Sequence, residues 1–229
     1  MTKGRCLGLI GGLGVGATAH YYRRLAEAHA ERAASLDFVM VHAETPRVFE
    51  YVEAEDRVGL ADYLLGFVQR MKEAGAEFAA IPAVTPHYCV RELLAKSPLP
   101  VLNIFDPLAE NLAARELRRV GVFGTRFVMD SELFGMVDGV EIVHARPDEA
   151  ESIHKTYVEL ARRGKGTEEQ FRSLTEIAKT LCARDEAEAI VLAGTDLALL
   201  FDETNTEFPS VDCAALHLTA IANVLLAET

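Results

Sequence analysis

Short apolar runs that end in small residues divide this chain at regular intervals. Runs of four to six apolar residues bounded by Gly, Pro or Thr are typical of buried parallel strands, whose two faces are both covered. The predicted strands cover residues 6–10, 38–41, 78–82, 101–105, 119–123, 140–144 and 189–193.

Apolar residues at helical spacing fill the intervals between these strands. Leu60, Leu64 and Phe67 recur on one face of a predicted helix. Thr167 and Gln170 form the pattern of a capping box and indicate a helix start. The predicted helices cover about residues 17–33, 60–71, 85–95, 107–114, 128–134, 148–163 and 168–184, with a last helix from about residue 213. Strands that alternate with helices predict an α/β fold with parallel sheets.

The two halves of the chain repeat the same pattern about 110 residues apart. Gly8–Gly12 and Ala79–Thr85 in the first half correspond to Gly121–Thr125 and Ile190–Asp196 in the second. Because the carboxyl ends of parallel strands meet at one edge of a sheet, two such halves face to face would create a cleft lined by these segments. The repeat predicts two pseudo-symmetric lobes, each with a parallel sheet flanked by helices.

Composition narrows the classes of partner. The 229 residues carry a formal net charge of −12, and half of them are apolar. An acidic chain is a poor match for nucleic acid or an anionic membrane as its main partner. No apolar segment approaches the roughly 20 residues that span a bilayer, and no signal peptide is evident, so a cytoplasmic location is expected.

The four cysteines are far apart in the sequence and form no CxxC pair. They are interpreted as reduced thiols rather than as disulfides or a zinc site. Cys213, which follows Asp212, is the one thiol with a possible chemical function, and a buried inert cysteine is its alternative interpretation.

Both strand-end motifs resemble those of the aspartate/glutamate racemase family. In that family the first motif usually reads Cys-Asn-Thr and the second Gly-Cys-Thr-Glu, whereas this chain has Ala83-Val84-Thr85 and Ala193-Gly194-Thr195-Asp196. The resemblance implies a racemase-like fold of two lobes, residues 1–102 plus 209–229 and residues 103–208. It also implies activity without PLP or another cofactor, and a homodimer.

The same resemblance places Ala83 and Gly194 at the positions of the two family cysteines, so the ordinary two-thiol mechanism is not possible here. Asp196 takes the position of the family glutamate. Asp196 and His87 are therefore the predicted catalytic residues, because both can titrate usefully. The alternative for His87 is a helix-end histidine that is hydrogen-bonded to the backbone.

Thr85, Thr125 and Thr195 each follow a predicted strand, and their hydroxyl groups with nearby amides could hold a carboxylate. Gly12 and Leu13 belong to a glycine-rich loop, which is predicted either to line a small anionic ligand or to form only a tight turn. By similarity to aspartate racemases, Arg47 and Lys165 are candidates to bind a second carboxylate.

Other sites have weaker sequence support. The segment from Gly12 to Ala17 fits a dinucleotide fingerprint, but an acidic residue is not in place at the end of the second strand. No spacing of His, Asp or Glu indicates a metal.

Three functions remain open on this basis. The first is racemase- or isomerase-type chemistry at the α-carbon of a small amino acid or dicarboxylate. The second is a carboxylate-binding or regulatory protein that has lost catalysis, and the third is a lyase or hydrolase on the same fold.

Overall fold

The chain forms two compact units in a computed structural model that describes residues 5–227. Unit 1 comprises Met1–Ile104 and His217–Thr229, and unit 2 comprises Phe105–Leu216. The sequence repeat places the change of lobe at residue 103 and the return at residue 209, whereas the structure makes these changes at residues 105 and 217. The return therefore falls inside the last helix.

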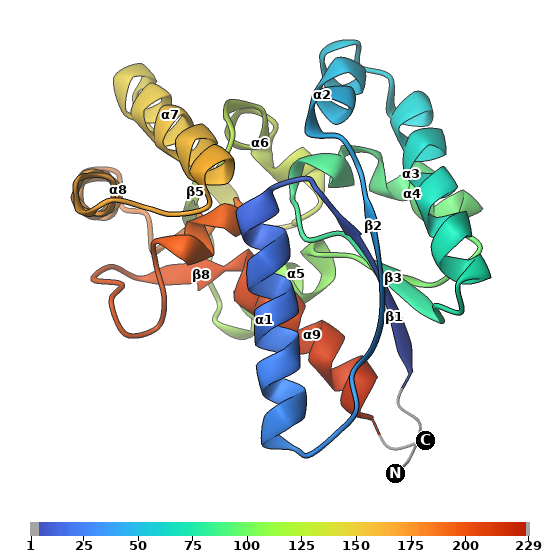
Figure 1. The fold of residues 1–229 in the computed structure, drawn as a ribbon. Helices are drawn as coiled ribbons and strands as arrows, with labels where there is room; N and C mark the ends of the chain where they lie inside the picture. Colours follow the sequence, from blue (N-terminus) through green and yellow to red (C-terminus); the bar gives the residue numbers. More distant parts are fainter. Residues whose placement is uncertain (1–4, 228–229) are drawn as a thin grey trace. The chain divides into compact units, whose positions relative to one another are not determined.

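Unit 1 contains a four-stranded parallel sheet in the order β2-β1-β3-β4. Helices α1 and α9 cover one face of this sheet, and α3 and α4 cover the other (Figure 1). Its elements are β1 (Cys6–Gly11), α1 (Val15–Glu31), β2 (Asp37–His42), α2 (Thr45–Glu53), α3 (Arg57–Glu73), β3 (Phe78–Ala80), the 3-10 helix η1 (Thr85–Cys89), α4 (Val90–Lys96), β4 (Val101–Leu102) and most of α9 (Cys213–Leu226).

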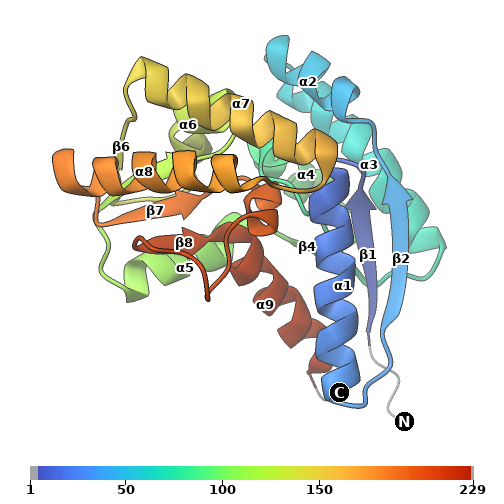
Figure 2. The ribbon, with the colours of Figure 1, turned by 60° about the vertical axis from the view of Figure 1, so that its left-hand side comes forward.

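Unit 2 contains a second four-stranded parallel sheet in the order β6-β5-β7-β8. Helix α5 runs beside β8 in Figure 2, and α8 lies along β7. Its elements are α5 (Phe105–Ala114), β5 (Arg119–Phe123), α6 (Arg126–Asp130), η2 (Glu132–Gly135), β6 (Glu141–Val143), α7 (Pro147–Arg163), α8 (Glu168–Arg184), β7 (Ala189–Leu192), η3 (Thr195–Leu199) and β8 (Ser210–Asp212).

The two sheets have the same connectivity, which agrees with the sequence repeat. In each unit the first strand of the unit is central, the second lies at one edge, and the third and fourth follow on the other side. A 3-10 helix begins at a threonine after the third strand in both units, at Thr85 and at Thr195. The predicted α/β fold with two parallel sheets is confirmed.

Local physical chemistry explains the positions of helices α3 and α8. The side chains of Leu60, Leu64 and Met71 on α3 are completely buried, as their spacing predicts. At the start of α8 the Thr167 hydroxyl accepts a hydrogen bond from the Gln170 amide at 3.2 Å. The Gln170 side chain accepts one from the Thr167 amide at 2.9 Å. The predicted capping box is therefore present.

Several helical segments differ from the sequence prediction. The helix predicted for residues 128–134 is α6 followed by the 3-10 helix η2, and the 3-10 helix η3 was not predicted. Helix α2 was not predicted, because only Val48 and Val52 are buried on its two turns and so short an apolar stripe gives little periodic signal. The single helix predicted for residues 85–95 is a 3-10 turn followed by the α-helix α4. Within residues 5–227, no helix is long and apolar enough to cross a membrane.

Candidate functional site

The glycine-rich loop after β1 is held in place by contacts within unit 1. Gly12 has a φ of 88°, and a Cβ atom at this position would lie 2.3 Å from the carbonyl oxygen of Ala43. The Gly12 amide donates to the Thr18 hydroxyl at 3.2 Å, and the Gly12 carbonyl accepts from the Thr45 hydroxyl at 2.8 Å. Leu13 is buried. The loop thus has the tight-turn geometry that only glycine adopts easily, and ligand binding by Gly12 and Leu13 stays a prediction.

His87 lies in η1, directly after the strand-end motif, and is buried. Its Nδ1 contacts the carbonyl oxygen of Ala83 at 2.8 Å, and its Nε2 accepts the amide of Ile104 at 3.4 Å. Both contacts are satisfied by one neutral tautomer, with the proton on Nδ1. Burial lowers the pKa of His87 to about 4. The ring therefore links the ends of β3 and β4 and is uncharged at neutral pH.

His217 forms a second buried polar centre in unit 1, with its ring centroid 6.4 Å from that of His87. Its Nε2 lies 3.0 Å from the carbonyl oxygen of Leu102, and its Nδ1 lies 3.2 Å from the hydroxyl of Tyr21. Burial, followed by the proximity of His87, lowers the pKa of His217 to about 3. This ring is also neutral, and it holds the start of the unit-1 part of α9 against β4.

The two other predicted binding residues of unit 1 differ in their surroundings. Thr85 is half-buried at the first position of η1. Arg47 is exposed on α2, where its guanidinium forms an ion pair with Glu50 at 2.6 Å and lies 5.2 Å from the ring of Tyr51. Arg47 would have to leave Glu50 to bind a ligand carboxylate.

Unit 2 holds the remaining predicted residues. Thr125 is buried and caps α6, where its hydroxyl accepts the Val128 amide at 3.2 Å. Lys165 is exposed in the turn between α7 and α8, next to Gly164, which closes α7 with a φ of 66°. Thr195 and Asp196 begin η3, and both are completely buried.

Tyr157 on α7 packs against the strand-end motif and was not predicted as a site residue. Its hydroxyl donates to Oδ2 of Asp196 at 3.3 Å and is also hydrogen-bonded to the side chain of Thr195. Burial, followed by the charge of Asp196, raises the pKa of Tyr157 well above 10. The phenol is therefore neutral. One sequence signal was available, because a tyrosine buried on a helix needs a hydrogen-bond partner for its hydroxyl.

The ring of Tyr157 also determines what can stand at position 194. A Cβ atom on Gly194 would lie 2.2 Å from Cε2 and 2.7 Å from Cδ2 of Tyr157. Gly194 has a φ of −130°, which any residue can adopt, so the backbone does not require glycine there. The close approach of the Tyr157 ring requires it.

Three of the four cysteines lie in surroundings that disfavour the thiolate. Cys6, Cys89 and Cys213 are buried, and Cys182 is half-buried. Burial raises the pKa of Cys89 to about 12, and it raises the pKa values of Cys213 and Cys182 above their ordinary range. A thiol that is protonated at neutral pH is a weak base and a weak nucleophile. These environments match the interpretation of inert, packing cysteines.

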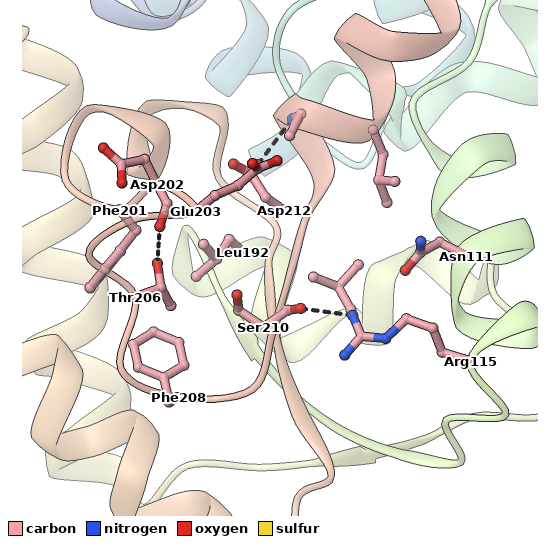
Figure 3. A pocket seen from close by; sticks show the side chains of 13 residues that line it. Asn111, Arg115, Leu192, Phe201, Asp202, Glu203, Thr206, Phe208, Ser210 and Asp212 are labelled. Atoms are coloured by element: carbon pink, nitrogen blue, oxygen red, sulfur yellow. Dashed lines mark hydrogen bonds between the residues drawn. The ribbon is translucent and has the colours of Figure 1, made fainter.

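A hollow of about 370 Å³ in unit 2 lies between α5, the loop after η3 and β8 (Figure 3). Its charged groups support the surrounding backbone: Arg115 donates to the Ser210 carbonyl at 2.8 Å, and Asp212 accepts the Ala214 amide at 2.8 Å. Asp202 accepts the Thr204 amide at 2.7 Å. None of the predicted site residues lines this hollow. Among the described residues, no cluster of three or more metal-binding side chains is present.

A model of the Asp/Glu/hydantoin racemase family matches residues 10–221. The chain belongs to this family. Solved racemase-like structures share its fold. A protein from Yersinia pestis assigned as an Asp/Glu racemase has 24% sequence identity and a TM-score of 0.80, with 97% of this chain and 100% of that chain covered.

Two further structures extend the comparison across the racemase family. An aspartate racemase homologue from Pyrococcus horikoshii has 22% identity and a TM-score of 0.77, with 96% and 99% of the two chains covered. Glutamate racemase from Thermus thermophilus, solved with β-chloro-D-alanine, has 18% identity and a TM-score of 0.63, with 96% and 80% covered. At these identities the likeness establishes the fold, and this chain's chemistry has to be argued from its own residues.

Proposed function

We propose that this protein catalyses cofactor-independent proton transfer at the α-carbon of a small amino acid or dicarboxylate, with a carboxylate in place of a thiol. The observation that carries this proposal is Asp196. This carboxyl group is completely buried at the end of β7, beside the hydroxyl groups of Tyr157 and Thr195. Buried carboxyl groups at a strand end of an α/β fold are characteristic of catalytic sites.

The family membership supports this class of reaction, and the side chains define how it would proceed. Asp196 would remove the α-proton, as the carboxylate base at this strand end. Glycine at position 194 and alanine at position 83 leave neither place with an acid/base group of its own.

The assignment of the first proton step to Asp196 follows from the state of His87. Both ring nitrogens of His87 have backbone partners, and its pKa of about 4 keeps it neutral. To act as a base, His87 would have to release the Ile104 amide. We therefore propose that His87 fixes the strand end in unit 1, and that its direct participation is secondary to that of Asp196.

A carboxylate-binding protein without catalysis is the second candidate. The observation that favours it is the same neutral, fully engaged pair His87 and His217, together with thiols whose pKa values are raised by burial. A racemase needs one acid/base group on each face of the α-carbon. Asp196 supplies one such group, and a protein that does not use it as a base would bind a carboxylate without exchanging its α-proton.

Proton NMR in D₂O separates these candidates. The purified protein is mixed with D- and L-aspartate, D- and L-glutamate and related dicarboxylates, and the α-proton signal is followed over time. The proposed function predicts loss of that signal from at least one compound, because the abstracted proton exchanges with solvent. Line broadening without exchange would contradict catalysis and support the binding protein, and no effect from any compound would contradict both.

A further inference from the structure

The buried side of η3 contains a hydrogen-bond chain with a defined direction. The phenol of Tyr157 has a single proton, which it donates to Oδ2 of Asp196 at 3.3 Å. Its hydrogen bond with Thr195 must therefore use the phenol oxygen as the acceptor. The order of donation is Thr195 hydroxyl to Tyr157 hydroxyl to Asp196 carboxyl, and all three side chains are buried.

The ring of Tyr157 is fixed by contacts on the other side. It lies across the α-carbon of Gly194, so closely that a Cβ atom there would be 3.0 Å from Cζ and nearer still to two other ring atoms. Ile153 and Leu160, which precede and follow it on the same face of α7, are completely buried. The packed ring therefore has little freedom to turn, and it holds its hydroxyl group next to Asp196.

We propose that Tyr157 is the positioning residue for Asp196: its ring occupies the space that a side chain at position 194 would need, and its hydroxyl orients the carboxyl group and stabilises its ionised form. This inference rests on the proposed function, in which Asp196 is the acid/base group. The titratable group that faces Asp196 from α7 is Tyr157, and its neighbour on η3, Thr195, does not titrate.

The consequence is a measurable effect on the titration of Asp196. A hydrogen bond donated to a carboxylate favours the charged form and lowers its pKa. Because the phenol stays protonated throughout the range in which a carboxyl group titrates, the donor is always available. Removing the hydroxyl while keeping the ring should raise the pKa of Asp196 by about 1 to 2 units, the shift expected for one hydrogen bond to a charged acceptor.

The test compares wild type with Tyr157→Phe, which keeps every ring atom against Gly194. In protein labelled with ¹³C at aspartate carboxyl groups, the Asp196 signal is identified by its absence in Asp196→Asn and is followed against pH. An upward shift of about 1 to 2 units is expected. An unchanged or lowered midpoint would overturn the inference. Tyr22→Phe is the matched control, because Tyr22 is 53% exposed on α1 in unit 1, and it should leave the midpoint in place.

This measurement needs no turnover, so it is independent of the proposed function. If the wild type exchanges the α-proton of a substrate, the midpoint of the acid limb of the rate–pH profile should move to higher pH in Tyr157→Phe. The shift should equal that of the carboxyl titration. A merely structural role of Tyr157 would not produce this shift. Absence of exchange in the wild type would refute the proposed function and leave the titration result intact. A shifted midpoint with an unshifted pH profile would refute the positioning role in catalysis.

Discussion

Gly194→Cys should lower the free energy of unfolding by about 3 kcal/mol. The reason is steric: the new Cβ atom would lie 2.2 Å from Cε2 of Tyr157. Real Cβ contacts are never this short, so the ring or η3 has to move. Urea unfolding of both proteins measures the difference.

Two further variants make the Gly194 experiment specific. Gly66→Ala on α3 is the matched control, because a Cβ atom there has no heavy atom within 4 Å and a helical alanine should be neutral or stabilising. In a Tyr157→Ala background the cost of Gly194→Cys should largely disappear, since the clashing ring is gone. A cost that persists in that background would contradict the assignment of Tyr157 as its cause.

Acidification should destabilise the protein between pH 6.5 and 5 through two buried histidines. The pKa values of His87 and His217 are lowered in the folded state to about 4 and about 3, from 6.5 in the unfolded chain. In this range the unfolded state binds protons that the folded state does not, so stability falls as pH falls. Above pH 6.5 the histidines do not reduce the free energy of unfolding. Below pH 6.5 each of them lowers the free energy of unfolding by up to about 1.4 kcal/mol per pH unit.

The histidine contribution can be isolated by variants measured at the same pH values. Most carboxyl groups remain ionised above pH 5, which limits their effect in this window. His20, whose pKa is also lowered by burial, adds to the slope in wild type and variants alike. His217→Gln should make the free energy of unfolding depend less steeply on pH, by the amount that corresponds to about one proton bound on unfolding. His144→Gln, which changes an exposed histidine, should leave this slope unchanged. Equal slopes in all three proteins would show that His217 does not carry the effect.

The fold could be predicted from the sequence because short stretches of sequence indicate most of its elements. Helical spacing located α3, the Thr167 and Gln170 pattern located the start of α8, and the repeated strand ends indicated two related sheets. The ends of the helices and strands and the short helices could not be predicted in the same way. Helix α2 and the 3-10 helix η3 are too short to show a period, and their positions depend on packing rather than on local preference.

The candidate site could be predicted only in part, because sequence patterns indicate local structure and not contacts between distant segments. The strand-end motif located Thr195 and Asp196, since strand ends are local features. The contact between Tyr157 and Gly194 joins a helix to a strand end distant in sequence, and nothing in either segment alone predicts it. The surroundings of His87 were likewise undetermined, because its Nε2 partner, the Ile104 amide, follows β4.

The most direct test of α-carbon chemistry without a thiol is the α-proton exchange rate in D₂O for wild type and Asp196→Asn. The asparagine has the same shape and can still accept the Tyr157 hydroxyl, so folding and ligand line broadening should be retained. Asp130→Asn, an exposed change in unit 2, is the control. We predict exchange in the wild type and in Asp130→Asn, and a loss of about 100-fold or more in Asp196→Asn. Exchange at the wild-type rate in Asp196→Asn would contradict the account.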